Sequence, residues 1–364
     1  MVVTYKKLGG LTASLGLLLA SSALSPGRAA DAGKTGPFKI AFSNATIGNS
    51  WHQGYIHSIE TAVDEAKKAG LIAKYASANA NGDSSVQASQ IRAFVVQGYQ
   101  AIIVDATSAS ALNGAIAQAC AHGVVVVGVD QTVTAPCAYN VYETFEAATK
   151  EQAETFAKAL GGKGNVLEVR GTAGTLPDQQ MHNGMEQGLQ SSPNMKVVGT
   201  TYADWTDTVA QQKVAAMLPS LPKVDAVVGQ GGDGAGSARA FQAAGRPMPM
   251  IGFGNRGNEL RIWSDELKKN PNYVAVSTMS MPGIGSAGVW TAIAILQGQK
   301  LPKQIRFPLL AVTKDTLDVW VQHTPPDGVA STDLTQAQGD ALLKSNLAGT
   351  VPESVKATPG GFKF

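Results

Sequence analysis

The sequence of 364 residues has little charge, few aromatic side chains and only two cysteines. Charged residues make up 15% of the chain and aromatic residues 6%, and the formal net charge is +2. This near balance of charge gives no basic footprint for nucleic acid and no electrostatic attraction to a membrane surface. The composition therefore favours neither nucleic acid nor a membrane surface as a partner. Because aromatic residues are few, each tryptophan near a strand end is a candidate for the ligand site.

The spacings that mark common catalytic and metal sites are also missing. The chain has no Gly-x-Ser-x-Gly elbow, no carboxylate pair spaced as acid and base, and no Cys-x-x-Cys or His-x-x-x-His pair. His52 and His57 fall on one predicted helix, but their spacing does not place them on one face as metal ligands. We expect neither an enzyme nor a metal or cofactor site.

The N-terminus carries an apolar stretch behind two lysines. Lys6 and Lys7 precede an apolar stretch at residues 8–20, and residues 25–32 are mostly small. This is the pattern of a secretory signal peptide. We expect residues 1–30 to be removed between about Ala29 and Ala32, which sends the protein to the periplasm; a retained anchor helix is the alternative. No cysteine is present there for a lipid anchor, and no other run reaches the roughly twenty apolar residues that span a bilayer.

The remaining chain is long enough for two domains with their own cores. Residues 123–131 read Gly-Val-Val-Val-Val-Gly-Val-Asp-Gln, which predicts a strand buried on both faces, as in parallel sheets. Similar apolar runs end in small or polar residues at 39–44, 101–105, 226–230 and 250–255. Open α/β sheets bind ligands at the carboxyl ends of their strands, so Asp130 is a binding candidate, with a turn or helix-capping role as the alternative.

Helical segments lie between the predicted strands. One helix is expected at residues 51–69 with Ser50 as its N-cap, and another begins after Asp83 and ends at Gly98. Strands that alternate with helices of this length predict right-handed βαβ units and an α/β doubly wound sheet. The glycine-rich break at residues 161–164 favours two similar lobes with the ligand site in the crevice between them.

The two cysteines are Cys120 and Cys137. Cys120 falls near the end of a predicted helix, and Cys137 precedes a predicted strand at residues 138–142 on the same sheet edge. An exported protein with an even number of cysteines favours a disulfide, and we expect these two residues to form one. The alternative is a packed helix cysteine and a free loop thiol.

Residues 229–234 read Gly-Gln-Gly-Gly-Asp-Gly, which matches the Gly-x-Gly-x-x-Gly spacing of dinucleotide-binding loops. The next strand end offers Gly254 and Asn255 rather than an acidic residue for a ribose hydroxyl. We therefore interpret this loop as a close approach to a small ligand and not as a nicotinamide site.

Five sets of stretches appear in the order typical of one family: residues 40–43 with 49–51, 123–130, 171–175 with 184–185, 203–205, and 245–246 with 251–254. On these stretches, residues 37–314 resemble the type I periplasmic solute-binding proteins of ABC importers, the group of the ribose-binding proteins. The resemblance implies two Rossmann-like lobes joined by a hinge. LacI-type regulators have the same two lobes behind a DNA-binding headpiece. This chain has a predicted leader at the position of the headpiece, which excludes a repressor of that type.

The departures from the family pattern fall at sugar-contacting positions. The sugar binders usually have arginine at the positions of Gln131 and Met181. They usually have asparagine at the position of Gly231, aspartate at that of Gly254, and glutamine or asparagine at that of Ser280. A buried site that loses several polar partners loses affinity for a pyranose, so a standard ribose or galactose pocket is disfavoured. The lack of an expected arginine also disfavours an organic anion, although the glycine loop leaves that class open. Sugars, polyols and small neutral or amine-bearing metabolites all remain as ligands.

The resemblance and the strand ends together give a set of candidate ligand-binding residues. Asp130 would accept hydrogen bonds, and Trp51 and Trp205 would supply stacking faces. The other candidates are Asn44, Asn49, His52, Gln131, Thr175, Gln179, Met181, Gln230, Asp233, Asn255 and Ser280.

The expected N-terminal lobe comprises residues 37–142 and about 281–311, and the C-terminal lobe residues 143–280 and about 312–324. Crossings are placed near residues 142–143, 280–281 and Val312. Residues 325–364 would form a C-terminal extension, with a short helix near 335–345 and a flexible end. We expect the protein to capture a solute by hinge closure of the two lobes. It would act as a monomer and deliver the solute to an ABC permease and its ATPase. The alternative is a periplasmic sensor that docks on a chemoreceptor or sensor kinase.

Overall fold

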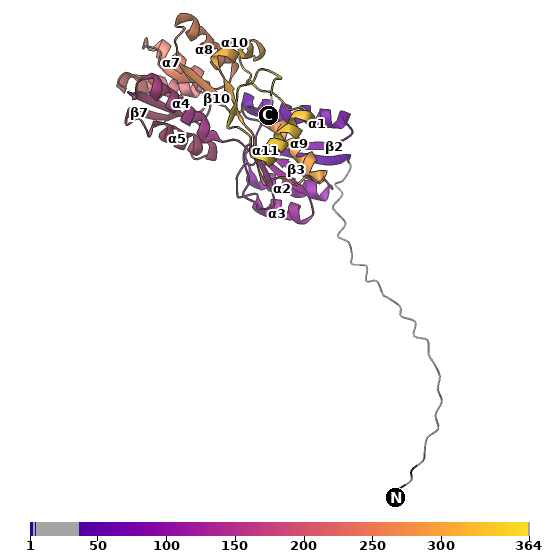
Figure 1. Ribbon diagram of the computed structural model, residues 1–364. Coiled ribbons are helices and arrows are strands. Elements are labelled where there is room, and N and C mark those ends of the chain that lie inside the picture. The colour runs from indigo at the N-terminus through magenta and orange to yellow at the C-terminus, as the bar shows by residue number, and fades with distance from the viewer. Residues whose placement is uncertain (3, 5–35, 363–364) are drawn as a thin grey trace. The chain divides into compact units, whose positions relative to one another are not determined.

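The computed structural model describes residues 1, 2, 4 and 36–362, so the expected leader and its cleavage site lie almost wholly outside the described residues (Figure 1). The chain divides into two units, Met1–Ala32 and Gly33–Phe364. All that follows concerns the second unit. Among the described residues, no helix is long and apolar enough to cross a membrane.

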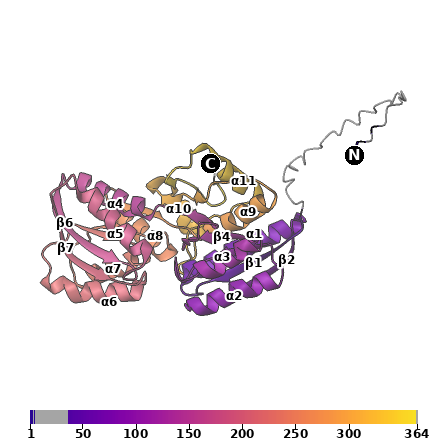
Figure 2. The same cartoon turned by 90° about the horizontal axis from the view of Figure 1, so that it is seen from below.

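The first sheet of Gly33–Phe364 has six strands in the order β11-β5-β4-β3-β1-β2, and every neighbouring pair is parallel. Its strands are β1 (Phe38–Asn44), β2 (Ile72–Asn79), β3 (Ala101–Val104), β4 (Val125–Val129), β5 (Tyr139–Tyr142) and β11 (Gln304–Arg306). The helices that pack on it are α1 (Ser50–Lys68), α2 (Ser84–Val96), α3 (Asn113–Ala121) and α9 (Ile284–Leu296). Helices α1 and α9 pack together on one face and α2 and α3 on the other, so the apolar strands β3 and β4 are buried from both sides (Figure 2).

The second sheet has seven strands in the order β13-β12-β10-β9-β8-β6-β7. Its strands are β6 (Lys163–Arg170), β7 (Asn194–Tyr202), β8 (Ala226–Gly229), β9 (Met250–Gly252), β10 (Ala275–Met279), β12 (Leu309–Val312) and β13 (Ser354–Val355). The β10–β12 pair is antiparallel and all other neighbouring pairs are parallel, so β12 and β13 run opposite to the other five strands. The helices of this part are α4 (Phe145–Ala159), α5 (Leu176–Leu189), α6 (Asp207–Met217), the short 3-10 helix η1 (Leu218–Ser220), α7 (Gly234–Ala243), α8 (Gly257–Lys269) and α10 (Lys314–His323). Helices α4 and α5 pack on each other, as do α6 and α7 (Figure 2).

We call the first sheet with its helices the first lobe and the second sheet with its helices the second lobe. The prediction of two doubly wound α/β lobes is confirmed by these two sheets. The chain leaves the first sheet after β5, returns to α9 after β10, and enters the second sheet again between β11 and β12. The last of these crossings falls at residues 307–308, ahead of the expected Val312, because β12 already pairs with β10.

The C-terminal segment joins both lobes. Helix α11 (Gln336–Ala348) packs on α1 and α9 of the first lobe, whereas β13 pairs with β12 of the second. The expected flexible end is wrong as far as Phe362, whose ring is buried and stacks on Phe307 with the ring centres 5.9 Å apart. Apolar contact of this kind fixes a chain end that its composition alone leaves undetermined.

Cys120 and Cys137 form a disulfide bond in the structure. Cys120 belongs to α3, and Cys137 lies just before β5, which pairs in parallel with β4. The bridge ties the end of a helix to the start of the next strand at the edge opposite the strand ends that carry Asp130. It is therefore a scaffold element and takes no part in the site.

Candidate functional site

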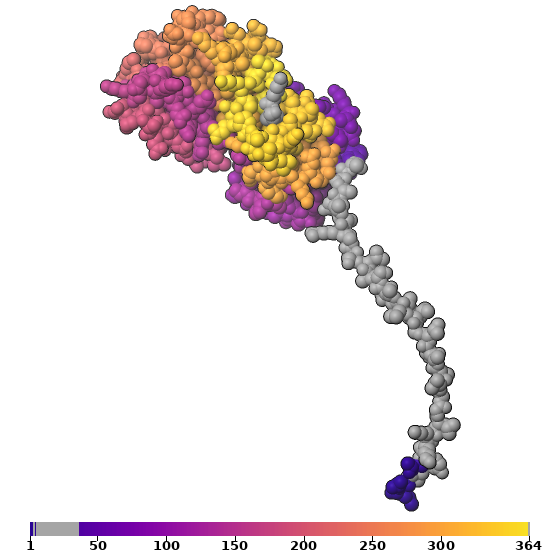
Figure 3. Space-filling model, viewed as in Figure 1, coloured from indigo at the N-terminus to yellow at the C-terminus, as the bar shows by residue number. Residues whose placement is uncertain are grey.

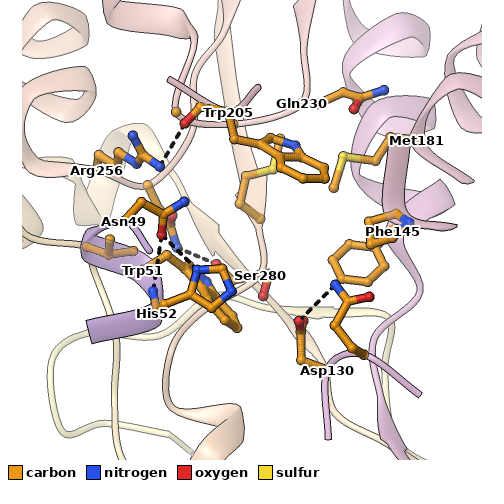
Figure 4. Close-up of a pocket in the computed structure, with 17 residues that line it drawn as sticks. Asn49, Trp51, His52, Asp130, Phe145, Met181, Trp205, Gln230, Arg256 and Ser280 are labelled. Carbon is orange, nitrogen blue, oxygen red and sulfur yellow. Dashed lines mark hydrogen bonds between the residues drawn. The ribbon is translucent and has the colours of Figure 1, made fainter. Parts of the chain in front are cut away.

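A cavity of about 120 Å³ lies where strand ends and helix starts of the two lobes meet (Figure 4). Its lining combines large apolar side chains with hydrogen-bonding groups. The residues are Asn49, Trp51, His52, Asp130, Gln131, Phe145, Pro177, Met181, Trp205, Gln230, Gly231, Gly232, Asn255, Arg256, Met279, Ser280 and Val329. Apolar walls with a few convergent polar groups are typical of sites for small organic ligands. We call this cavity the pocket.

The start of α1 forms one wall of the pocket. Asn49, and not the expected Ser50, is the N-cap, because its Oδ1 accepts hydrogen bonds from the backbone N–H of His52 at 3.2 Å and from its ring at 3.1 Å. Burial, and then the nearby Arg256 cation, lower the pKa of His52, so its imidazole is neutral at neutral pH. The indole of Trp51 stacks on Tyr55 with centroids 5.4 Å apart, which fixes the ring that the pocket meets.

Asp130 follows directly after β4 and adopts a left-handed backbone conformation with φ of 62°. A non-glycine residue there costs roughly 1–2 kcal/mol and usually marks a site where the backbone is held for a reason. Burial raises the pKa of Asp130 to about 7, and the Gln131 amide 3.4 Å from its Oδ2 opposes the rise. The carboxyl group can therefore gain or lose a proton near neutrality.

Two further carboxyl groups are buried near Asp130. Asp105 is 1% exposed and Glu143 is 3% exposed, and none of their carboxylate oxygens has a hydrogen-bond partner among the described residues. Burial first, and then the Asp130 charge, raise the pKa of both groups. For Glu143, the Ser280 hydroxyl and the Met281 amide are the nearest donors, and they partly favour the charged form. The raised pKa values favour the protonated forms, each of which carries one O–H donor. Neither group lines the pocket itself.

Trp205 faces the pocket from the second lobe, on the loop after β7. Asp204 and Trp205 both have φ of 51°, a second stretch of left-handed backbone at the site. The indole lies so close to Gly171 that a Cβ atom there would be 2.0 Å from Cε2 of Trp205. Glycine at 171 is thus required for this ring position.

Arg256 is the residue that the sequence analysis missed most clearly. Its side chain lines the pocket and lies across from Asp130 (Figure 4), and its Nη2 donates a hydrogen bond to the carbonyl oxygen of Trp205 at 3.0 Å. The expectation that the pocket holds no arginine is therefore wrong. The sequence did offer one signal for Arg256: it lies two residues after Gly254, at the end of a predicted strand, and directly before α8. Four apolar lining residues were also missed: Phe145, Pro177, Met279 and Val329. Phe145 and Pro177 lie at helix starts and Met279 at a strand end, where an apolar residue resembles part of the core, and Val329 lies outside the regular elements.

Ten of the fourteen predicted ligand-binding residues line the pocket. They are Asn49, Trp51, His52, Asp130, Gln131, Met181, Trp205, Gln230, Asn255 and Ser280. The Gln230 side chain is nevertheless already paired, since it accepts from the Gly171 amide at 2.8 Å and donates to the Asp178 carbonyl at 3.0 Å. These two bonds fix the orientation of the side chain, and one N–H and one oxygen lone pair of the amide remain for a ligand.

Four predicted residues lie outside the pocket. Asn44 is buried and donates to Thr46 and Asn79, and Gln179 is exposed and donates to the Gly174 carbonyl. Thr175 lines an adjoining cavity that shares Asp130, Gln131, Phe145 and Pro177 with the pocket. Asp233 is buried at the start of α7, where burial and the neighbouring Glu259 raise its pKa. These side chains follow strand ends but point into the protein or to other surfaces.

The glycine loop at residues 229–234 lines the pocket and does not form an open anion-binding site. Gly231 and Gly232 line the pocket, both with positive φ, and a Cβ atom at Gly232 would lie 2.5 Å from Cζ of Arg256. At the start of α7, the Gly234 amide donates to the carboxylate of the fully buried Glu259 at 3.0 Å. A protein carboxylate thus occupies the helix end that would otherwise attract an anion.

Comparison with known proteins gives the family. Residues 40–300 match the family described as periplasmic binding protein domain. A xylitol-binding protein of Mycolicibacterium smegmatis is 30% identical, over 67% of this chain and 70% of its own. A ribose import binding protein of Bacillus subtilis is 29% identical, over 84% of this chain and 97% of its own. A crystal structure of an ABC transporter solute-binding protein from Thermobispora bispora superimposes with a TM-score of 0.79 at 35% identity, covering 89% of this chain and 99% of the other.

The chain belongs to the periplasmic binding protein family. Its role is therefore that of an extracytoplasmic solute-binding protein of the ABC import class, and not that of an enzyme. The family accounts for the two lobes and for a pocket at their strand ends. The ligand has to be argued from the side chains.

Proposed function

We propose that the protein captures a small, uncharged polyhydroxy compound, a polyol or a small sugar, in the pocket and delivers it to a membrane permease. The observation that carries the proposal is the opposition of Asp130 on the first lobe to Arg256 on the second across one small cavity. A carboxylate accepts from hydroxyl groups and a guanidinium donates to them, so a chain of hydroxyls can satisfy both ends.

The apolar walls support the same ligand class. Trp51, Phe145 and Trp205 are large, flat side chains that cover the C–H faces of a carbohydrate while its hydroxyls reach the polar groups. One acidic and one basic residue balance each other, which favours a ligand with no net charge. The relatives named for xylitol and ribose bind, by their names, compounds of this class.

An acyclic polyol fits the side chains better than a pyranose does. Gln131, Met181, Gly231 and Ser280 offer fewer or shorter polar groups than the sugar binders have at these positions, and Gln230 is held by backbone groups. A flexible chain can turn its hydroxyls toward Asp130 and Arg256, whereas a ring that needs several fixed partners would leave some of them unpaired.

Hinge closure would couple binding to transport. The lobes are joined by short crossings at residues 143–144, 280–283 and 307–308. A ligand that contacts both lobes binds the closed form better than the open form, and this difference in affinity sets how far it can shift the equilibrium. We further infer that residues 1–30 are removed on export to the periplasm and that the protein acts as a monomer with a permease and its ATPase.

Thermal unfolding of the purified protein against polyols, sugars, amines and organic acids tests the proposal. A ligand present at a thousand times its dissociation constant stabilises the folded state by about 4 kcal/mol, which raises the melting temperature by several degrees. We expect one polyol or sugar to do so, and the shift to disappear in Asp130→Ala and Trp51→Ala.

Gln179→Ala is the matched control, because Gln179 is an exposed residue outside the pocket. It should keep the full shift. A panel in which only amines or organic acids stabilise the protein would overturn the polyhydroxy assignment.

A further inference from the structure

The segment of residues 325–334, which we call the strap, runs from the end of α10 in the second lobe to the start of α11 in the first. It lies beyond residues 40–300, the part of the chain that matches the family. C-terminal residues, coloured yellow, form a large area of the surface in Figure 3. The strap is thus outside the matched part of the chain, as are the helices α10 and α11 on either side of it.

The first half of the strap is bonded to the second lobe at the start of α8. The backbone amides of Gly257 and Asn258 donate to the carbonyls of Gly328 and Pro326 at 3.0 and 2.9 Å. Val329 forms an antiparallel bridge with Arg256. The strap thus runs along the segment that presents Arg256 to the pocket.

The second half of the strap is bonded to the first lobe at the start of α9. The hydroxyl of Ser331 accepts from the Gly283 amide at 2.8 Å. Leu334 donates to the Ser286 hydroxyl at 2.8 Å and accepts from the indole N–H of Trp290 at 2.7 Å. With bonds at both ends, the strap has a fixed course past the pocket.

One strap residue enters the pocket. Val329 lines the pocket, and it also lines a second cavity of about 480 Å³ on the strap side. Among the described residues, it is the one that borders both cavities. The second cavity, which we call the outer cavity, is otherwise lined largely by polar residues of α1 and the strap, including Gln53, His57 and Asp327.

We propose that Val329 sets the length of ligand that the pocket accepts, by closing its Arg256 end with an apolar side chain. The proposal rests on the proposed function and adds a specificity-determining residue to it. Val329 lines the pocket and is bridged to Arg256 through the backbone, so a polyol that spans from Asp130 to Arg256 would end beside it. One more hydroxymethylene unit would press a hydroxyl against two methyl groups and leave it without a partner.

Removing those methyl groups would join the pocket to the outer cavity. In Val329→Ala a longer chain could pass the strap and find water and polar side chains in the outer cavity. In Val329→Leu the pocket would be shorter still. The two variants thus change the preferred ligand length in opposite directions, which a merely structural residue would not do.

The experiment measures dissociation constants by calorimetry for erythritol, xylitol, sorbitol and perseitol, each one hydroxymethylene unit longer than the one before. For the wild type we expect affinity to fall at least about tenfold for the alditol just longer than the preferred one. Val329→Ala should remove most of that loss, and Val329→Leu should extend it to the preferred alditol.

Val355→Ala is the matched control, because Val355 is a half-buried valine in the same C-terminal segment, on β13 and outside both cavities. It should leave the length preference unchanged. If wild type binds the longest alditol as well as the shorter ones, or if Val329→Ala keeps the wild-type ratio of affinities, the role of Val329 is refuted while the proposed function stands. If wild type binds none of these alditols and no sugar, the proposed function itself fails.

Discussion

Nη2 of Arg256 lies 3.0 Å from the carbonyl oxygen of Trp205, and both side chains line the pocket. The bond connects the start of α8 to the left-handed turn that carries Trp205. It leaves the other N–H groups of the guanidinium for the pocket, and no ion pair with Arg256 is formed among the described residues. A single side chain thus supports an aromatic wall and supplies the positive end of the site.

Replacing Arg256 by lysine should weaken ligand binding by about tenfold or more. Lysine keeps the charge but loses the planar fork, so it cannot hold the Trp205 carbonyl and a ligand hydroxyl together. Calorimetry with the best ligand measures the loss. Arg246→Lys is the control, since Arg246 also donates to backbone carbonyls in the second lobe but lies away from the pocket. Equal affinity losses in both variants would show that Arg256 acts only through stability.

Gly171→Ala should displace the Trp205 ring. The new methyl group would overlap the indole, because an ideal Cβ position lies 2.0 Å from Cε2. We expect a loss of affinity of at least about tenfold together with a lower melting temperature, since a strained or moved wall affects both. Tryptophan fluorescence with and without ligand reports the ring position.

Gly114→Ala provides the contrast for that variant. Gly114 belongs to α3, and a Cβ atom there would meet nothing within 4 Å. Alanine in a helix should raise stability by roughly 0.5–1 kcal/mol and leave affinity unchanged. Unaltered binding in Gly171→Ala would mean that the indole of Trp205 is not a wall of the binding site.

Much of the fold follows from sequence patterns because buried parallel strands are continuous apolar runs. The run before Asp130 predicts β4, and the polar residue at its end predicts a residue of the pocket. The alternation of such runs with helices then predicts the two doubly wound lobes. The C-terminal segment could not be predicted in this way, because the short β13 depends on β12 for pairing and on tertiary contacts for burial.

The site could be predicted only in part, because its composition depends on contacts between residues distant in sequence. Gln230 follows a strand end, but whether its amide is free depends on Gly171 and Asp178. Arg256 looks like an ordinary helix-start residue until the Trp205 loop is placed beside it. Val329 has no pattern at all, since its role arises from the course of the strap.

Loss of the Cys120–Cys137 disulfide should lower stability without changing affinity. The bridge closes a loop between cysteines 17 residues apart, which on the chain-entropy model is worth about 3 kcal/mol. We expect the Cys120→Ser, Cys137→Ser double variant to melt several degrees lower and to keep the wild-type dissociation constant. A large change in affinity would contradict the view that the bridge is remote from the site. Reduction of the wild type under native conditions gives the same comparison without mutation.

Asp130→Asn should separate stability from binding through its pH dependence. The pKa of Asp130 is about 7 in the folded protein against an ordinary value of 3.8, so between these two values the folded state binds more protons than the unfolded state. Stability therefore falls as the pH rises from about 4 to about 7, and the contribution is lost above the folded pKa. Asparagine has no charge to bury, so the variant should lose this part of the slope.

Melting temperatures at pH 5 and pH 8, without ligand, measure the difference. We expect wild type to lose stability relative to Asp130→Asn between the two pH values, and the variant to be the more stable protein at pH 8. Its ligand affinity should nevertheless be at least about tenfold lower at pH 8, because an amide cannot replace a carboxylate that accepts from two hydroxyls. If the melting temperatures of wild type and variant change in parallel with pH, Asp130 is already ionised at pH 5. Its carboxylate is then better hydrated than its burial implies.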